Sequence, residues 1–223
     1  NDMNATRTAL QPQRRVGTRA AAAEATREAI LRAATKVFAR YGYAGATVDK
    51  ISSAAKSVDR MIYYYFGSKE ALFVAVLERL YARMDEVEAA LDLDESQPIE
   101  SLVELIRFVL GYYRAHPEFV TLLNSENLHR GQHIAKSRKA RDYSLRAIGI
   151  TDRLLTAGVA QKLVRPGLNA RHVYLLIAAA GYFYMANRYT LSAFLGERID
   201  TPEAIAAWDD YVIDSVLRSV RSA

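Results

Sequence analysis

The chain has 223 residues, of which 51% are hydrophobic and 25% charged, an ordinary composition for a folded protein of one or two domains. It has no cysteine, which excludes disulfides and thiolate metal sites, and its longest apolar run, residues 173–186, is too short to cross a bilayer. No apolar signal-peptide core precedes the first predicted helix, so we expect a cytoplasmic protein with no membrane partner.

The net charge of +5 is concentrated near the N-terminus. Residues 1–70 carry 12 Lys and Arg against 6 Asp and Glu, whereas residues 71–223 carry 18 against 19. Phosphate binding requires such a local excess, although many basic surfaces are only solvated. The charge is informative here because a DNA-binding pattern lies in the same segment.

Residues 1–18 lack apolar periodicity and contain Arg7, Arg14 and Arg15, which predicts a flexible basic arm. Two interpretations stay open. The arm is a tail without a role, or it binds DNA along the phosphates or in the minor groove.

From about residue 20 the sequence predicts helices. Ile30, Leu31, Ala34, Val37 and Phe38 recur at the spacing of a helix with one buried face.

Two short helices follow. Thr47 is a good N-cap for a helix over Val48–Ala54, and a second short helix is expected over residues 59–65. Gly67 ends that helix, and Ser68 caps a long one that follows.

Farther along, Pro98, Pro117 and Pro202 each stand where a first helical turn begins, and Thr201 is a plausible cap before the last of them. Residues 165–167 form a break, and Asn169 can cap the helix that follows. We count about nine helices and no strand. The predicted fold class is all-α.

The features that identify residues 27–80 are dense and ordered. They are Ala33, Ala34, Phe38, Ala39, Tyr41, Gly42, Tyr43, Thr47, Val48, Ile51, Ala54, Ala55, Ile62, Tyr63, Tyr64, Tyr65, Phe66, Gly67, Ser68, Lys69 and Glu70. This segment resembles the helix-turn-helix DNA-binding domain of TetR-family transcriptional regulators (TetR/AcrR type). The resemblance implies a three-helix DNA-binding domain over residues 19–67 and a larger effector-binding and dimerisation domain over residues 68–223.

The turn before the recognition helix departs from the family pattern. The family usually has Ala-Gly-Val-Ser there, and this chain has Ala55, Lys56, Ser57 and Val58. Lys56 replaces a glycine that tolerates positive φ. If Ser57 caps the helix, the helix starts one residue early. The sequence therefore does not decide which side chains face the groove.

Arg60 is the best candidate to contact bases, because a guanidinium pairs bidentately with guanine. Asp59 fits two roles, accepting from cytosine or stabilising the helix N-terminus. Ile62 and Phe66 share one helical face and are predicted to enter the core.

The resemblance further implies that Tyr63 lies near bases or backbone and that Tyr64, Tyr65, Thr47 and Lys69 contact phosphates. The alternative for the tyrosines is packing within the domain. The predicted DNA-binding residues are Thr47, Lys50, Lys56, Ser57, Asp59, Arg60, Tyr63, Tyr64, Tyr65 and Lys69.

Residues 169–195 are apolar, with small residues at 178–181. The last helix places an apolar row along one side: Ile205, Trp208, Val212, Val216 and Val220. The resemblance implies that these two helices form a four-helix interface in a homodimer, which would read a palindromic double-stranded DNA operator. The alternative is that they are the core of one monomer.

A small-molecule effector pocket combines apolar walls with a few polar groups. The predicted effector-binding residues are Phe108, Tyr112, Asn124, Asn127, His129 and Tyr143. Glu126, His129 and His133 share one helical stripe, a spacing that also fits a divalent metal or an acid–base centre. No cofactor is predicted.

The sequence therefore predicts a ligand-responsive regulator, a dimeric repressor released from its operator by a small effector. An activator would have the same sequence features. A helical enzyme built on the Glu126 stripe is the first alternative, but no catalytic or cofactor fingerprint accompanies it. An architectural DNA binder is the second, and it would discriminate little between DNA sequences.

Overall fold

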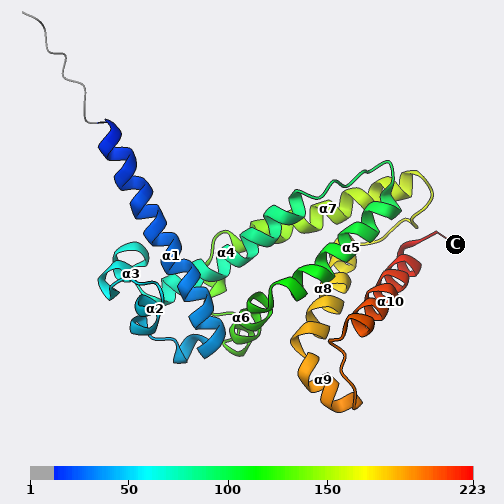
Figure 1. Cartoon of the computed structure of the whole chain (residues 1–223). Helices are drawn as coiled ribbons and strands as arrows, with labels where there is room; N and C mark the ends of the chain where they lie inside the picture. The colour runs from blue at the N-terminus through cyan, green and yellow to red at the C-terminus, as the bar shows by residue number, and fades with distance from the viewer. Residues whose placement is uncertain (1–12, 223) are drawn as a thin grey trace, which may run out of the picture. The chain divides into compact units, whose positions relative to one another are not determined.

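The computed structural model describes residues 13–222 (Figure 1), and residues 1–12 of the predicted arm lie outside that part. The described residues form ten α-helices and one 3₁₀ helix, with a single isolated β-bridge between Val164 and Arg221 and no strand. The all-α prediction is confirmed. The contacts divide the chain into two compact units between Leu72 and Phe73.

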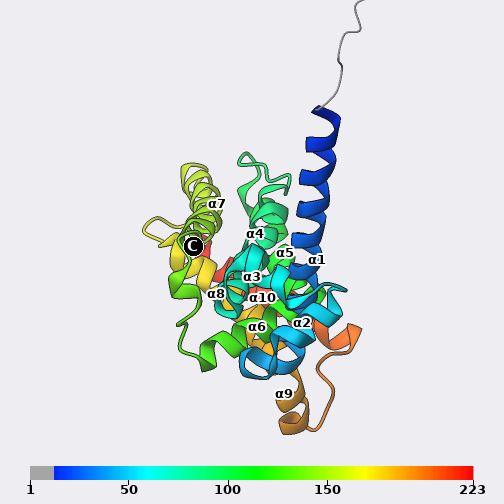
Figure 2. The ribbon, with the colours of Figure 1, turned by 90° about the vertical axis from the view of Figure 1, so that its left-hand side faces the viewer.

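The first unit contains α1 (Gln13–Gly45), α2 (Val48–Ala54), α3 (Asp59–Phe66) and the start of α4 (Lys69–Ala89), as Figure 2 shows. Residues 13–18, predicted as arm, already belong to α1. α1 bends at Gly42, whose φ of 67° and ψ of 175° are not helical. The predicted apolar face of α1 is buried.

The turn between α2 and α3 places Lys56 at a φ of 51°, the region that favours glycine. α3 begins at Asp59 after Val58, and no side chain caps it. The prediction that Ser57 caps an earlier start is therefore wrong: the backbone N–H of Ser57 instead donates to the carbonyl of Ser52 at 2.9 Å.

We expect Lys56→Gly to raise the free energy of unfolding by up to roughly 1 kcal/mol. The left-handed conformation costs a side-chain-bearing residue about 1–2 kcal/mol, which exceeds the roughly 0.5–1 kcal/mol of entropy that glycine loses on folding. Urea denaturation measures the change. Ser53→Gly within α2 is the matched control and should lose roughly 0.5 kcal/mol. A loss for Lys56→Gly would contradict the expectation.

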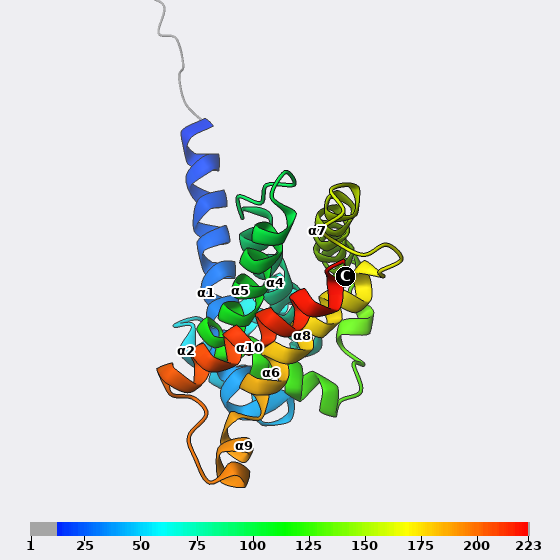
Figure 3. The same cartoon turned by 90° about the vertical axis from the view of Figure 1, so that its right-hand side faces the viewer.

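The second unit contains the rest of α4 and the helices that follow it. These are α5 (Pro98–Ala115), α6 (Pro117–Leu128), the 3₁₀ helix (Ile134–Lys136), α7 (Ala140–Ala160), α8 (Ala170–Ala186), α9 (Arg188–Leu195) and α10 (Pro202–Val220). α8 is central, because it packs against α5, α6, α7 and α10. Figure 3 shows α8 and α10 side by side.

The predicted start signals hold in this unit. Pro98, Pro117 and Pro202 each open a helix, and the side chains of Asn169 and Thr201 accept N-cap hydrogen bonds. Residues 169–195, predicted as one segment, instead divide at Asn187 into α8 and α9, which accounts for the tenth helix.

The small residues of α8 serve contacts within one chain. A Cβ on Gly181 would lie 2.9 Å from the ring of Tyr113 and 3.0 Å from Leu110, so glycine lets α5 and α8 approach closely. Val212, Val216 and Val220 of α10 are also buried in this chain. These three residues are therefore core of the monomer, and their prediction as dimer interface is wrong.

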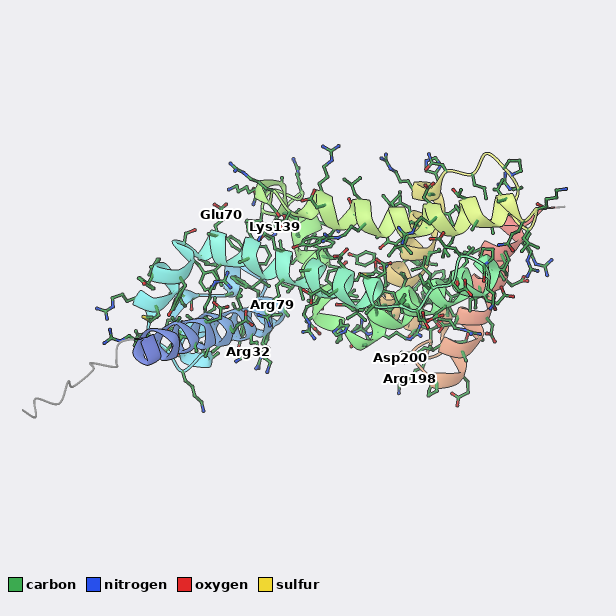
Figure 4. The ribbon with its side chains drawn as sticks, turned by 90° about the horizontal axis from the view of Figure 1, so that it is seen from above. Arg32, Glu70, Arg79, Lys139, Arg198 and Asp200 are labelled. Carbon is green, nitrogen blue, oxygen red and sulfur yellow. The ribbon has the colours of Figure 1, made fainter. Side chains whose placement is uncertain are left out.

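Ion pairs fix α10 and the loop before it. Arg114 of α5 donates to both carboxylate oxygens of Asp209 at 2.8 Å. Arg198 pairs with Asp200 in the loop between α9 and α10, where Figure 4 labels both. Over the described residues, no helix combines the length and apolar character that spanning a membrane would require.

Candidate nucleic-acid interface and interior cavities

α3 presents its polar and aromatic side chains on one exposed face. Ile62 is fully buried, whereas Tyr63 and Tyr64 are 53% and 76% exposed. Tyr65 is half-buried, with its ring 5.0 Å from that of Tyr64 in an edge-on contact. Phe66, predicted as core, is only half-buried, because it packs at the surface under the guanidinium of Arg27, 5.1 Å from its ring.

The first turn of α3 carries two charged residues with different surroundings. Asp59 accepts a hydrogen bond from the hydroxyl of Ser52, which joins α3 to α2. This contact favours the structural role for Asp59 over base contact. Arg60 is exposed on the same turn. Of the two, Arg60 is the better placed to reach a base.

Lysines surround the end of α1. Lys50 donates to the carbonyl of Gly45 at 2.8 Å, and its ammonium lies 4.5 Å from the ring centre of Tyr41. Lys69 lies 4.5 Å from the ring centre of Tyr43, and partial burial lowers its pKa. The Thr47 hydroxyl accepts from the backbone N–H of Lys50 at 3.2 Å. These contacts hold the positive charges near α2 and α3.

The second unit contains two partly open cavities that share the side chains of Tyr81, Tyr113 and Leu123. The larger, of about 300 Å³, is lined from α4, α5, α6, α8 and the segment before α7. The smaller, of about 150 Å³, lies among α4, α5, α6, α7 and α8. Apolar walls with a few polar groups are the usual composition of a small-molecule site.

The predicted effector residues divide between these cavities and other places. Asn127 lines the larger cavity and Tyr143 the smaller. Asn124 accepts a hydrogen bond from the hydroxyl of Tyr182, which lines the larger cavity.

The other predicted effector residues, Phe108, Tyr112 and His129, line neither cavity. Tyr112 is buried against the ring of His116, with the ring centres 4.2 Å apart. His129 donates from Nδ1 to the carbonyl of Ser125 at 2.8 Å. Their side chains therefore serve local packing.

Glu126 and His133 form a buried hydrogen-bonded pair. The Nδ1–H of His133 donates to Glu126 Oε2 at 2.8 Å, and the backbone N–H groups of His133 and Ile134 donate to Oε1 at 2.8 and 3.0 Å. Within residues 13–222, no group of three or more His, Asp or Glu side chains is arranged to hold a metal ion.

The contribution of α4 to the cavities was not predicted from the sequence. Leu77, Tyr81, Met84 and Glu88 line them, spaced by four, three and four residues. That spacing places a carboxyl group on an otherwise apolar helical face. A charged residue on an apolar helical face was the sequence signal that could have identified this contribution of α4.

Glu88 is 2% exposed, and its Oε1 has no hydrogen-bond partner. Burial raises the pKa of Glu88 to about 7, with a smaller contribution from the negative charge of Asp85. Burial likewise raises the pKa of Tyr113 and of Tyr174, so both phenols stay neutral. Asp85 itself is paired with Arg146, 2.7 Å away.

Comparison with known proteins agrees with this architecture. Residues 30–76 match the family model "Bacterial regulatory proteins, tetR family", and residues 98–216 match "Tetracyclin repressor-like, C-terminal domain".

Two curated relatives are repressors. The chain is 47% identical to the HTH-type transcriptional repressor NicS of Pseudomonas putida, over 93% of this chain and 98% of that protein. It is 31% identical to the HTH-type transcriptional repressor SCO4008 of Streptomyces coelicolor, over 71% and 78%. Among solved structures, the transcriptional regulator SCO4942 of Streptomyces coelicolor aligns with a TM-score of 0.65 and 24% identity, over 87% and 98% of the two chains. That last likeness shows the fold alone.

Proposed function

The chain belongs to the TetR family of transcriptional regulators and is a DNA-binding repressor, not an enzyme, and from this we propose that it binds a palindromic operator as a homodimer and leaves it when a small effector binds. The observation that carries the proposal is the pairing of two features in one chain. One is an exposed polar α3 in a helix-turn-helix unit, and the other is a tyrosine-lined interior cavity in the second unit.

In the proposed complex, α3 enters the major groove with Arg60 on a base edge and Tyr63 beside it. Tyr64 and Tyr65 donate to phosphates, and Lys50, Lys56 and Lys69 surround them with positive charge. Thr47 and Ser57 contribute from α2 and the turn, while Asp59 positions α3 through Ser52.

We expect Arg60→Ala to weaken operator binding by roughly 1–3 kcal/mol and to relax the preference at one base pair of each half-site. Lys50→Ala should weaken all DNA sequences alike and reduce the salt dependence of binding by about one ion. Fluorescence anisotropy on matched and mismatched duplexes at several salt concentrations separates the two effects. Equal losses on both duplexes for Arg60→Ala would contradict base contact.

The proposed dimer contact lies on α8 and α10. Phe183 and Tyr211 are 55% and 65% exposed, and together with Trp208 they line one surface hollow. Leu176, seven residues before Phe183, extends the apolar surface along α8. Large apolar side chains gathered on one surface indicate an interaction site.

Release by an effector requires that the effector bind one conformation more tightly than the other. α4 is the element through which the proposal connects both parts, since it begins beside α3 in sequence and carries cavity-lining residues farther on. Effector binding would shift α4 in each subunit and change the separation of the two α3 helices.

Selection of binding sites from random DNA tests the proposal directly. We expect an inverted repeat bound at least roughly 10³-fold more tightly than random sequence. A single unrepeated motif would contradict the dimeric complex. Binding without any preference would favour the architectural alternative.

A further inference from the structure

We propose that the effector is a small ring compound with a protonated or N–H-bearing nitrogen, which donates to Glu88 in the smaller cavity. The proposal rests on the effector-responsive function above and names the chemical class that its cavity accepts. Only 2% of the surface of Glu88 is exposed. Glu88 lines that cavity, and its Oε1 has no hydrogen-bond partner.

Three carboxyl groups line the two cavities, and two of them already have partners. Glu126 accepts from His133 and from two backbone N–H groups. Asp85 accepts from Arg146 at 2.9 and 2.7 Å. Glu88 therefore holds the acceptor that is left for a ligand.

An unpaired buried acceptor costs free energy that a donor on a ligand would recover. Neither cavity has a Lys or Arg in its lining. An anionic ligand would consequently find no cationic partner in either lining and would be repelled by the carboxylate form of Glu88, whereas the charge of Asp85 is balanced by Arg146. Burial raises the pKa of Glu88 because no cation lies beside its carboxylate, and a cationic ligand placed there would stabilise the charged form.

The aromatic walls favour the same class. Tyr81, Tyr113, Tyr143 and Tyr174 line the smaller cavity around Glu88. Tyrosine ring faces attract cations, and flat ring compounds pack well against them. A cavity near 150 Å³ is about the size that holds one benzene ring in another protein.

The test uses the full chain and calorimetry with benzylamine, phenethylamine and benzamidine, and with benzyl alcohol and benzoate as neutral and anionic counterparts. We expect the cations to bind more tightly than benzyl alcohol, and benzoate not to bind. Glu88→Gln should weaken cation binding roughly 10- to 150-fold, the range of a charged hydrogen bond, and leave benzyl alcohol unchanged. Glu86→Gln, an exposed carboxyl on the same helix, is the matched control and should have no effect.

If none of the three cations binds, or if Glu88→Gln binds them as well as the unmodified chain does, the proposal is overturned. Operator release is measured in parallel, so that a failure of the Glu88 site can be distinguished from a failure of effector-responsive repression. Release by a neutral or anionic compound alone would overturn the Glu88 site and leave effector-responsive repression standing. Cation binding that depends on Glu88 without operator release would support the site and contradict the proposed response.

Discussion

Replacing Phe183 with glutamate is expected to produce a folded monomer that binds the operator roughly 10²- to 10⁴-fold more weakly, the contribution expected when two linked binding units are separated. Phe183 is an exposed residue of α8 that lines the hollow shared with Trp208 and Tyr211 of α10. Two glutamates brought together at a twofold interface would repel one another and lose their hydration.

The fold of the monomer should tolerate this change, because the buried face of α8 lies elsewhere. Val173, Ile177 and Met185 face the interior of the chain, whereas Phe183 does not. Light scattering at micromolar concentration measures the mass, and anisotropy measures operator affinity. Leu145→Glu, an exposed leucine on α7, is the matched control and should leave both unchanged. A dimeric Phe183→Glu variant would show that the interface lies elsewhere.

The sequence predicted the local elements well where a helix end carries its own chemical signal. Thr47, Asn169 and Thr201 cap the helices that they were expected to cap, and Gly67 and the three prolines stand at the predicted boundaries. Each signal depends on residues within one turn of one another. Such boundaries need no knowledge of the rest of the fold.

Features that depend on distant parts of the chain were predicted less well. The end of α8 at Ala186 has no proline or glycine beside it, so the break before α9 was missed. The row of valines on α10 was assigned to a partner subunit, because an apolar stripe does not reveal whether its cover comes from the same chain. Here the cover comes from α5 and α8 of the same chain, which both pack against α10.

The cavity shows the same limit. The predicted effector residues all lie within residues 101–160, but the walls also come from Tyr81 and Glu88 on α4 and Tyr174 on α8. These residues meet only when five helices pack together. Asn127 and Tyr143 were selected for their chemistry, and nothing in the local sequence distinguished them from Phe108 or Tyr112, which pack elsewhere.

We expect Glu126→Ala to lower the free energy of unfolding of the second unit by about 3–5 kcal/mol, because removal of one member of a buried polar pair leaves the other unpaired. Glu126 is 4% exposed and His133 1% exposed. The substitution removes the acceptor for the imidazole and for the backbone N–H groups of His133 and Ile134. For a protein of this length the loss corresponds to a melting temperature roughly 10 °C lower.

Because Glu126 of this pair lies in the wall of the larger cavity, we expect its loss to change that cavity as well as the stability of the fold. Glu126 lines the larger cavity, and the ring of His133 packs edge-on against Phe73 of α4, with the ring centres 5.0 Å apart. Calorimetric melting of Glu126→Ala is compared with that of Glu118→Ala, a more exposed carboxylate of α6 whose loss should cost less than about 1 kcal/mol. Equal, small losses in both variants would mean that the buried pair adds little. A large loss for Glu126→Ala alone would show that the packing of this part of the cavity wall against α4 depends on this carboxylate. Glu126→Gln keeps an acceptor for the two backbone groups and should recover part of the loss.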